Sequence, residues 1–269
     1  MYRTFSHPNH IIHYNFIAIV ITLCLLTSCA KEVGTTEKSP EVSSTAIGDA
    51  LREADRLFGE RADIVNLENA VKALGRVRDP DRRNFEVEWK YAKYCYFLGK
   101  GETDQTVAAE TFEKGRDAGR IAARVEKEKP DGHFWFAANL GELSRMSPLT
   151  VGLKSVDEIR EAMQKVVDSD PSYQGASAFD ALGQLEIATR NFKGGKTEKA
   201  VEYYEKGLSL APDNSNIRVH LAEALLALKR DAEARKQIDT VISMKPNPEF
   251  VVEHEIAVRK AKDLLSKNF

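Results

Sequence analysis

The sequence predicts an all-α protein built from helical-hairpin repeats, and three observations support this fold class. Charged residues make up 30% of the chain and aromatic residues only 8%. The helix formers Ala, Leu, Glu and Lys recur throughout, and apolar residues recur at the helical spacings of three and four. One pattern also occurs twice in tandem near the C-terminus, first as Ala200, Tyr204, Gly207 and Pro212, then as Ala234, Ile238, Val241 and Pro246.

All four positions of this pattern recur after 34 residues, which is the period of the tetratricopeptide (TPR) repeat. Small residues let the second helix of each hairpin approach the first, and the larger residue fills the space between hairpins. The proline ends the second helix. Leu221, Ala222 and Leu225 fit the first helix of the second copy. An unrelated hairpin with this spacing by chance is the alternative, which seven agreeing positions disfavour.

The preceding residues predict further, less regular hairpins. Asp63 is placed to begin a helix that ends before Pro80, and Thr103 or Asp104 is placed to cap a long helix that ends near Lys127. Leu-Gly pairs typical of the repeat occur at 140–141 and 182–183, and 111–115 resembles 203–207. The other expected helices are 47–58, 85–98, 133–145, one that contains Ile159, Met163 and Val166 and ends at Pro171, and a final capping helix at 249–265.

Two segments interrupt this regular arrangement. Residues 146–155 form an irregular stretch longer than an ordinary turn, and 191–196 form a loop. Gly195-Lys196-Thr197 ends like a phosphate-binding loop, but Arg190 occupies the position of the required first glycine, and no strand precedes it. We therefore interpret this segment as a turn between helices.

The N-terminus is predicted to carry a targeting signal. The apolar run 16–26 is too short to span a membrane and is typical of a secretory signal. It is followed by Leu26-Thr-Ser-Cys29, which resembles a bacterial lipobox, so Cys29 is the predicted lipidation site. A plain signal peptide with an incidental cysteine is the alternative. The predicted organisation is a signal peptide at 1–28, a flexible tether at 29–45 and the repeat domain at 46–269.

Composition disfavours several classes of function. With 39 basic and 41 acidic residues the net charge is −2, so the sequence gives no basic footprint for nucleic acid. After removal of the signal, Cys95 is the one cysteine besides Cys29, and it is expected to be a small buried residue. The remaining histidines are widely separated without a metal-ligand spacing, so neither a metal nor a cofactor is predicted. No nucleophile–base pair supports an enzyme.

Several segments resemble the T component associated with TRAP-type (tripartite ATP-independent periplasmic) transporters. These segments are 134–141, 170–176, 194–200 and 245–249. The resemblance implies an α-helical repeat lipoprotein on the periplasmic side of the outer membrane of a Gram-negative bacterium, consistent with Ala30 after the lipidated cysteine. It also implies that the partner is the periplasmic solute-binding protein of the transporter, with the transported ligand as a further candidate.

The predicted function is therefore that of a non-catalytic, membrane-tethered interaction protein. In TPR arrays the first helix of each hairpin lines the concave face, so the candidate binding residues lie near the Leu-Gly positions. They are Lys90, Tyr91, Tyr94, Trp135, Asn139, Glu142, Asp180, Gln184, Val219 and Glu223. A role for Tyr91, Tyr94 or Trp135 in hairpin packing is equally compatible with the sequence. The alternative function is a generic TPR lipoprotein scaffold in envelope or outer-membrane assembly, and a homo-oligomer is compatible with either.

Overall fold

The computed structural model describes residues 42–269, which belong to a compact unit, Glu41–Phe269, with its own hydrophobic core. The predicted signal and lipidation site Cys29 lie outside the described residues. The first helix begins at Ser44, close to the predicted start of the repeat domain. All regular elements among residues 42–269 are helices, which confirms the predicted all-α class.

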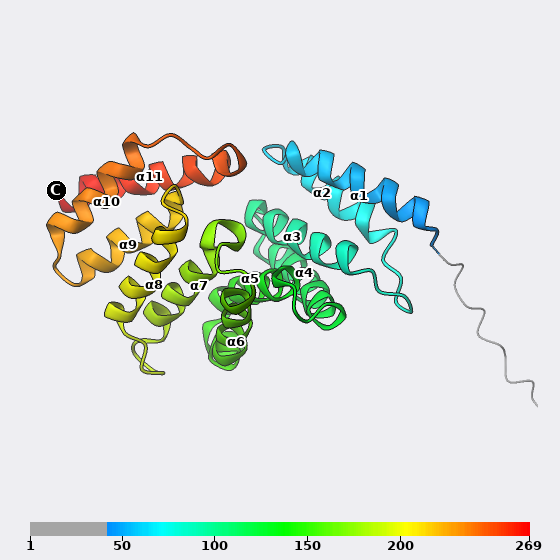
Figure 1. Cartoon of the computed structure of the whole chain (residues 1–269), viewed down its shortest axis with the longest axis horizontal. Helices are drawn as coiled ribbons and strands as arrows, with labels where there is room; N and C mark the ends of the chain where they lie inside the picture. The colour runs from blue at the N-terminus through cyan, green and yellow to red at the C-terminus, as the bar shows by residue number, and fades with distance from the viewer. Residues whose placement is uncertain (1–41) are drawn as a thin grey trace, which may run out of the picture. The chain divides into compact units, whose positions relative to one another are not determined.

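The described residues form five helical hairpins and a C-terminal helix (Figure 1). This confirms the predicted arrangement of four to five hairpins with a capping helix. The hairpins are α1 (Ser44–Gly59) with α2 (Ile64–Gly75), α3 (Phe85–Gly101) with α4 (Gln105–Val125), α5 (Pro130–Met146) with α6 (Leu153–Ser169), α7 (Tyr173–Thr189) with α8 (Thr197–Leu210), and α9 (Ser215–Ala227) with α10 (Asp231–Ser243). They are followed by α11 (Val251–Asn268).

The odd-numbered helices form the continuous side of this stack. Each of them packs against the next odd-numbered helix, whereas each even-numbered helix packs only against its neighbours in sequence. The first helix of every hairpin therefore faces the inside, as expected for TPR-like repeats. This arrangement makes α3, α5, α7, α9 and α11 the elements that can line a common surface.

Polar caps begin several helices where the sequence predicts them. The Asp63 carboxylate accepts a hydrogen bond from the Val65 backbone N–H, and Asp104 accepts from both Thr106 and Val107. Such caps satisfy backbone donors that have no partner inside the helix. Asp104, rather than Thr103, is thus the cap of α4.

A contact between a glycine and an aromatic ring recurs inside two of the hairpins. A Cβ placed on Gly183 of α7 would lie 2.4 Å from Cε1 of Tyr204 on α8, and one placed on Gly99 of α3 would lie 2.7 Å from Cε1 of Phe112 on α4. The absence of a side chain at each glycine lets the two helices of the hairpin approach, and the ring fills the space beside it. The similarity between 111–115 and 203–207 therefore reflects equivalent packing.

The structure differs from the prediction at the other Leu-Gly pair. A Cβ on Gly141 would meet no atom within 4 Å, so this glycine does not make the close approach made by Gly183. Two boundaries also differ: α3 continues through Gly99 to Gly101, and the final helix begins at Val251 after a short 3₁₀ turn, Pro248–Phe250. The irregular stretch contains a π-helical turn, η1 (Pro148–Gly152), before α6.

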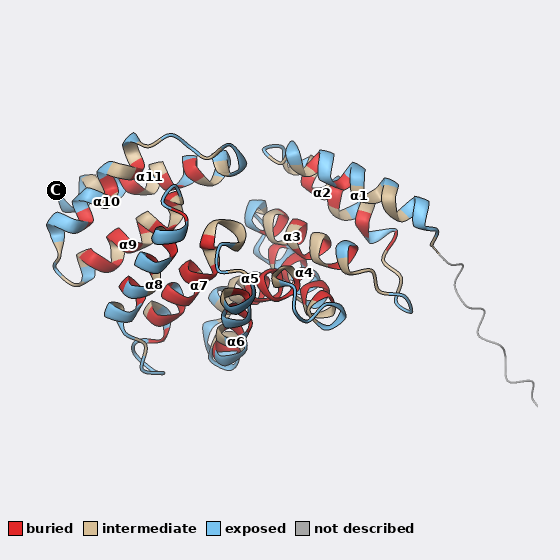
Figure 2. Ribbon diagram, in the orientation of Figure 1, coloured by how far each residue is buried: buried red, intermediate tan, exposed pale blue. Residues whose placement is uncertain are grey.

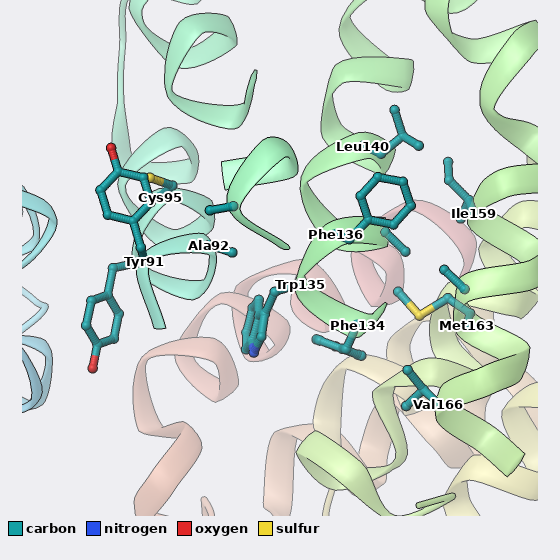
Figure 3. Close-up of a cluster of buried hydrophobic side chains, with 14 of the residues drawn as sticks. Tyr91, Ala92, Cys95, Phe134, Trp135, Phe136, Leu140, Ile159, Met163 and Val166 are labelled. Carbon is teal, nitrogen blue, oxygen red and sulfur yellow. The ribbon is translucent and has the colours of Figure 1, made fainter. Parts of the chain in front are cut away.

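Buried residues lie mainly where consecutive helices meet (Figure 2). They form two large clusters, and α7 contributes Leu182 to the N-terminal cluster and Phe179 to the C-terminal cluster. Figure 3 shows Trp135 between the α3 residues and the α5–α6 residues of the first cluster. Cys95 in this cluster is fully buried, and burial raises the pKa of its thiol to about 12. The cysteine is therefore held protonated in the core.

Candidate functional site

A groove with a volume of about 1660 Å³ lies along the inner helices. Residues of α3, α5, α7, α9 and α11 form most of its lining, and the α1–α2 turn, α2, η1, α6 and the 3₁₀ turn before α11 also contribute. Typical small-ligand pockets measure about 300–1,000 Å³. The groove is therefore large enough for a segment of another chain.

Aromatic side chains form one end of the groove. Trp135 packs against Tyr96, Phe97 and Phe134, with ring centroids 4.9 to 5.9 Å apart. Its indole N–H donates to the Tyr173 hydroxyl at 3.2 Å, and that hydroxyl donates to Asp131 at 2.8 Å. Burial, together with the Asp131 charge, raises the pKa of Tyr173. The hydroxyl thus remains a donor that fixes the orientation of the aromatic end.

Exposed large apolar residues contribute to the lining of the groove. The described residues include eleven exposed large hydrophobic residues, and five of them line this one groove: Leu149, Leu153, Phe192, Val252 and Ile256. Leu149 is 82% exposed. Single exposed apolar residues are ordinary, but a concentration of them around a concavity is typical of a binding surface.

The wall formed by α7 and α9 carries polar side chains. Asp180 accepts hydrogen bonds from the Gln184 amide at 2.8 Å and from Nδ1 of His220 at 2.7 Å. Burial alone would lower the pKa of His220, but the charge and the hydrogen bond of Asp180 outweigh it and raise that pKa. The pair can therefore carry a charged imidazolium next to its counter-ion beside the groove.

Charges around the groove are paired with one another. Glu142 binds Lys100 at 2.9 Å and Arg145 at 2.6 Å. Burial would raise the pKa of Glu142, and the two cations overcome this and lower it. Arg61, in the turn between α1 and α2, donates to the Glu249 carbonyl at 3.0 Å and pairs with Glu253 at 3.3 Å. This last contact joins the first hairpin to the C-terminal end of the repeat stack.

Half of the sequence-predicted binding residues line this groove, and half lie elsewhere. Those that line it are Trp135, Glu142, Asp180, Gln184 and Val219. Glu223 pairs with Lys260 at 2.8 Å and lines a smaller neighbouring pocket. The structure thus brings residues of three first helices, α5, α7 and α9, to one surface.

The remaining four predicted residues contact other helices. Lys90 pairs with Asp55 and Glu86, both at 2.7 Å, and the buried Tyr94 also donates to Asp55 while stacking on the Phe58 ring. Tyr91 lies beneath the Arg78 guanidinium, with burial raising the pKa of its hydroxyl to about 12. The Asn139 amide donates to the carbonyls of Ala92 and Trp135 at 3.0 and 2.7 Å. These contacts hold neighbouring helices together.

Sequence reasoning missed the exposed apolar residues around the groove because they lie outside the periodic positions. Leu149 is in η1, Phe192 is in the loop after α7, and Val252 is in the first turn of α11. A large apolar residue inside an irregular segment, such as Phe192, was the signal that could have found them.

Metal and membrane features are absent from the part of the chain that the structure describes. Among residues 42–269, no group of three or more His, Cys, Asp or Glu side chains is placed to hold a metal ion. Within the same range, no helix combines the length and apolar character needed to cross a bilayer.

Similarity to the solved structure of a TPR protein supports the repeat fold. TTC0263, a thermophilic TPR protein of Thermus thermophilus, aligns over 81% of this chain and 98% of its own with a TM-score of 0.58 and 17% identity. MamA from MSR-1 aligns over 83% of this chain and 97% of its own at 14% identity, with a TM-score of 0.45. Pseudomonas aeruginosa PilF aligns over 84% of this chain and 90% of its own at 18% identity, with a TM-score of 0.46. At 17% identity the similarity to TTC0263 concerns the fold alone.

Sequence comparison corrects the predicted family. No curated protein matches the chain. Residues 50–268, most of the chain, match the family described as regulator of microtubule dynamics protein 1-3, so the resemblance to the TRAP T component was wrong. One segment that carried it, Phe134 to Gly141, consists mostly of buried packing residues, whereas 170–176, 194–200 and 245–249 are mostly exposed or half-buried. The chain belongs to the family of regulator of microtubule dynamics proteins 1-3.

Proposed function

We propose that this protein is a non-catalytic interaction protein that binds an apolar segment of a partner protein in the groove of its inner helices. The observation that carries this proposal is the concentration of five exposed large hydrophobic residues around one concavity of about 1660 Å³. Burying such side chains against a partner gives a favourable contribution of about 25 cal/mol per Å² of apolar surface. A family described as regulators also fits a protein that acts by binding.

Gly141 allows a direct test, because it lines the groove and a side chain there would point into open space. Gly141→Trp should therefore fill part of the groove without disturbing the packing of α5. Gly59→Trp is the matched control, since Gly59 also lies in a helix, has no atom within 4 Å of an added Cβ, and is not part of the groove.

The experiment uses the full chain in lipid nanodiscs and a library of displayed 12-residue peptides, with empty nanodiscs for counterselection. The proposal expects selected apolar peptides whose affinity falls at least tenfold in Gly141→Trp and stays within twofold in Gly59→Trp. Selected peptides that bind both variants equally would place the binding surface elsewhere and refute the proposal.

A second candidate ligand is a small amphiphile with an alkyl chain. Val156, Ile159 and Met163 give the groove an aliphatic floor that fits such a chain. Dansyl-labelled undecanoic acid is a suitable probe. Displacement of this probe by the selected peptides would show one shared site, and tight binding of the probe without any selected peptide would favour the amphiphile.

We also propose that Cys29 is lipidated and tethers the domain to the periplasmic side of the outer membrane. The support is the apolar run 16–26 followed by Leu26-Thr-Ser-Cys29. Metabolic labelling with an alkyne fatty acid should mark the wild type and Cys24→Ser but not Cys29→Ser. Equal labelling of the two cysteine variants would contradict the tether.

A further inference from the structure

The first turn of α7 has an unusual backbone conformation. Gln174, Gly175 and Ala176 have φ values of 51°, 63° and 60°, in the left-handed region. Among the described residues, three non-glycine residues have positive φ, and two of them are in this turn. A side chain at positive φ places its Cβ close to the backbone, so the conformation is costly unless the surroundings hold it.

Side chains and backbone groups around the turn do hold it. The Asn214 amide donates to the Gly175 carbonyl at 2.7 Å, and the Ser177 hydroxyl donates to the Gln174 carbonyl at 2.6 Å. Asn214 also caps α9 by accepting from the N–H groups of Asn216 and Ile217. One side chain therefore fixes the strained turn and the start of the next inner helix together.

The turn places Gln174 in the lining of the groove. Gln174 is half-buried and lines the groove together with Gly175 and Ser177. Its amide interacts with the Tyr173 hydroxyl. A carboxamide has two donor hydrogens and an acceptor oxygen, so capacity for further hydrogen bonds remains. Strain kept at a ligand-facing position is typical of a functional contact.

The charged residues that line the groove already have ion-pair or hydrogen-bond partners. Each charged residue that lines it already has a partner among the described residues: Arg61 with Glu253, Lys100 and Arg145 with Glu142, Asp180 with His220, Lys260 with Glu223, Asp213 with Asn247, and Asp63 with the Val65 N–H. Nε of Arg61 and Nδ1 of His254 are buried without a hydrogen-bond partner among the described residues, and further capacity comes from the carboxamides of Gln174, Gln184 and Asn216. Such groups match an uncharged amide, which both donates and accepts.

We propose that Gln174 is a specificity-determining residue of the groove and binds a main-chain amide of an extended, uncharged apolar segment. This inference rests on the proposed function. A helical ligand uses its main-chain groups internally, whereas an extended segment leaves its N–H and C=O groups free for the carboxamide. The apolar side chains of such a segment would then contact Leu149, Leu153 and Phe192.

Two glycine substitutions test the role of the Gln174 side chain separately from the shape of the turn. Gln174→Gly and Ala176→Gly both relieve a positive φ, but Ala176 is fully buried and is not part of the groove. Thermal midpoints of both variants should equal or exceed that of the wild type. The most tightly bound peptide from the displayed 12-residue library, measured with the full chain in nanodiscs, should bind at least tenfold more weakly to Gln174→Gly and within twofold of the wild type to Ala176→Gly.

A chemically modified peptide provides a second test of the role of Gln174. N-methylation of the peptide at one amide should reduce affinity for the wild type at least fivefold and have less than a twofold effect on Gln174→Gly, because the partner side chain is then missing. Equal loss of affinity in both glycine variants, a Gln174→Gly affinity within twofold of the wild type, or a helical bound peptide would each overturn the inference.

Failure of this inference can be told apart from failure of the proposed function. If selected peptides lose affinity in Gly141→Trp but are insensitive to Gln174→Gly, the groove is the binding site and only the role of Gln174 is refuted. If no selected peptide responds to Gly141→Trp, both proposals fail.

Discussion

Alanine at Gly183 and Gly141 should have opposite effects on stability, although both glycines belong to Leu-Gly pairs in first helices. Glycine inside a helix is about 0.5–1 kcal/mol less favourable than alanine, so relief of this cost favours both substitutions equally. At Gly141 the new methyl group meets open space. We therefore expect Gly141→Ala to raise the free energy of unfolding by about 0.5–1 kcal/mol.

At Gly183 the new methyl group would lie 2.4 Å from Cε1 and 2.6 Å from Cζ of the buried Tyr204 ring. Overpacking of a well-packed core costs about 1–3 kcal/mol, which exceeds the helix gain. The expected net loss is about 1–2 kcal/mol. For a domain of this size, each kcal/mol changes the thermal midpoint by about 2–4 °C.

The measurement is urea and thermal unfolding of both variants, monitored by circular dichroism. A double-mutant cycle with Tyr204→Leu tests whether the Tyr204 ring causes the loss of stability, because a smaller, flexible side chain should remove most of the penalty of Gly183→Ala. A neutral Gly183→Ala variant, or a Gly141→Ala variant as unstable as Gly183→Ala, would refute the packing argument for the two glycines.

Three further predictions concern the paired charges and the buried cysteine. Since the folded-state pKa of His220 is raised by Asp180, the stability that this pair contributes, about 1 kcal/mol, is fully present below the unfolded pKa near 6.5 and is lost as pH rises through the folded value. The free energy of unfolding of the wild type should therefore lose this contribution between pH 6 and pH 8. A His220→Gln variant with the same pH dependence as the wild type would contradict the prediction. Arg61→Met should lengthen the distance between spin labels at positions 59 and 255, whereas Arg56→Met, which removes only the exposed pairs with Glu53 and Glu60, should leave the distance unchanged. Equal distances in the two variants would show that the Arg61–Glu253 pair does not hold the first hairpin to α11. Cys95 should resist Ellman's reagent in the folded protein at pH 8, because its thiol is fully buried with a pKa of about 12, and should react after unfolding in urea; rapid reaction before unfolding would show that the core opens there.

The sequence predicts the repeat scaffold well because scaffold packing depends on residue size at regular intervals. Ala200, Tyr204, Ala234 and Ile238 are all buried, as the 34-residue period requires. Asp63 and Asp104 cap the helices that their positions in the sequence predict. These contacts are local or lie between neighbouring helices, so sequence spacing is enough to find them.

The candidate site is harder to predict because the direction of a side chain depends on helix rotation. Tyr94 and Trp135 look equivalent in sequence, as aromatic residues of first helices, but Tyr94 turns toward α1 and donates to Asp55, whereas Trp135 reaches the groove. Gly141 matches the repeat pattern in sequence but makes none of its packing contacts. A shift of one position along a helix can turn a side chain from a packing contact toward the groove, and the periodic pattern does not determine which of the two directions a residue takes.

Several segments that depart from the repeat pattern contribute residues to the groove. Leu149 in η1, Gln174 in the left-handed turn, Phe192 in the long loop after α7 and Phe250 in the 3₁₀ turn all line the groove. Periodic positions such as Ala200, Tyr204 and Ile238 are buried in the core away from it. Core positions are constrained by packing, so variation among repeat proteins can alter the irregular segments with little loss of stability. We therefore expect the proposed ligand specificity to depend on the segments that leave the 34-residue period, and substitutions in those segments should change binding more than folding.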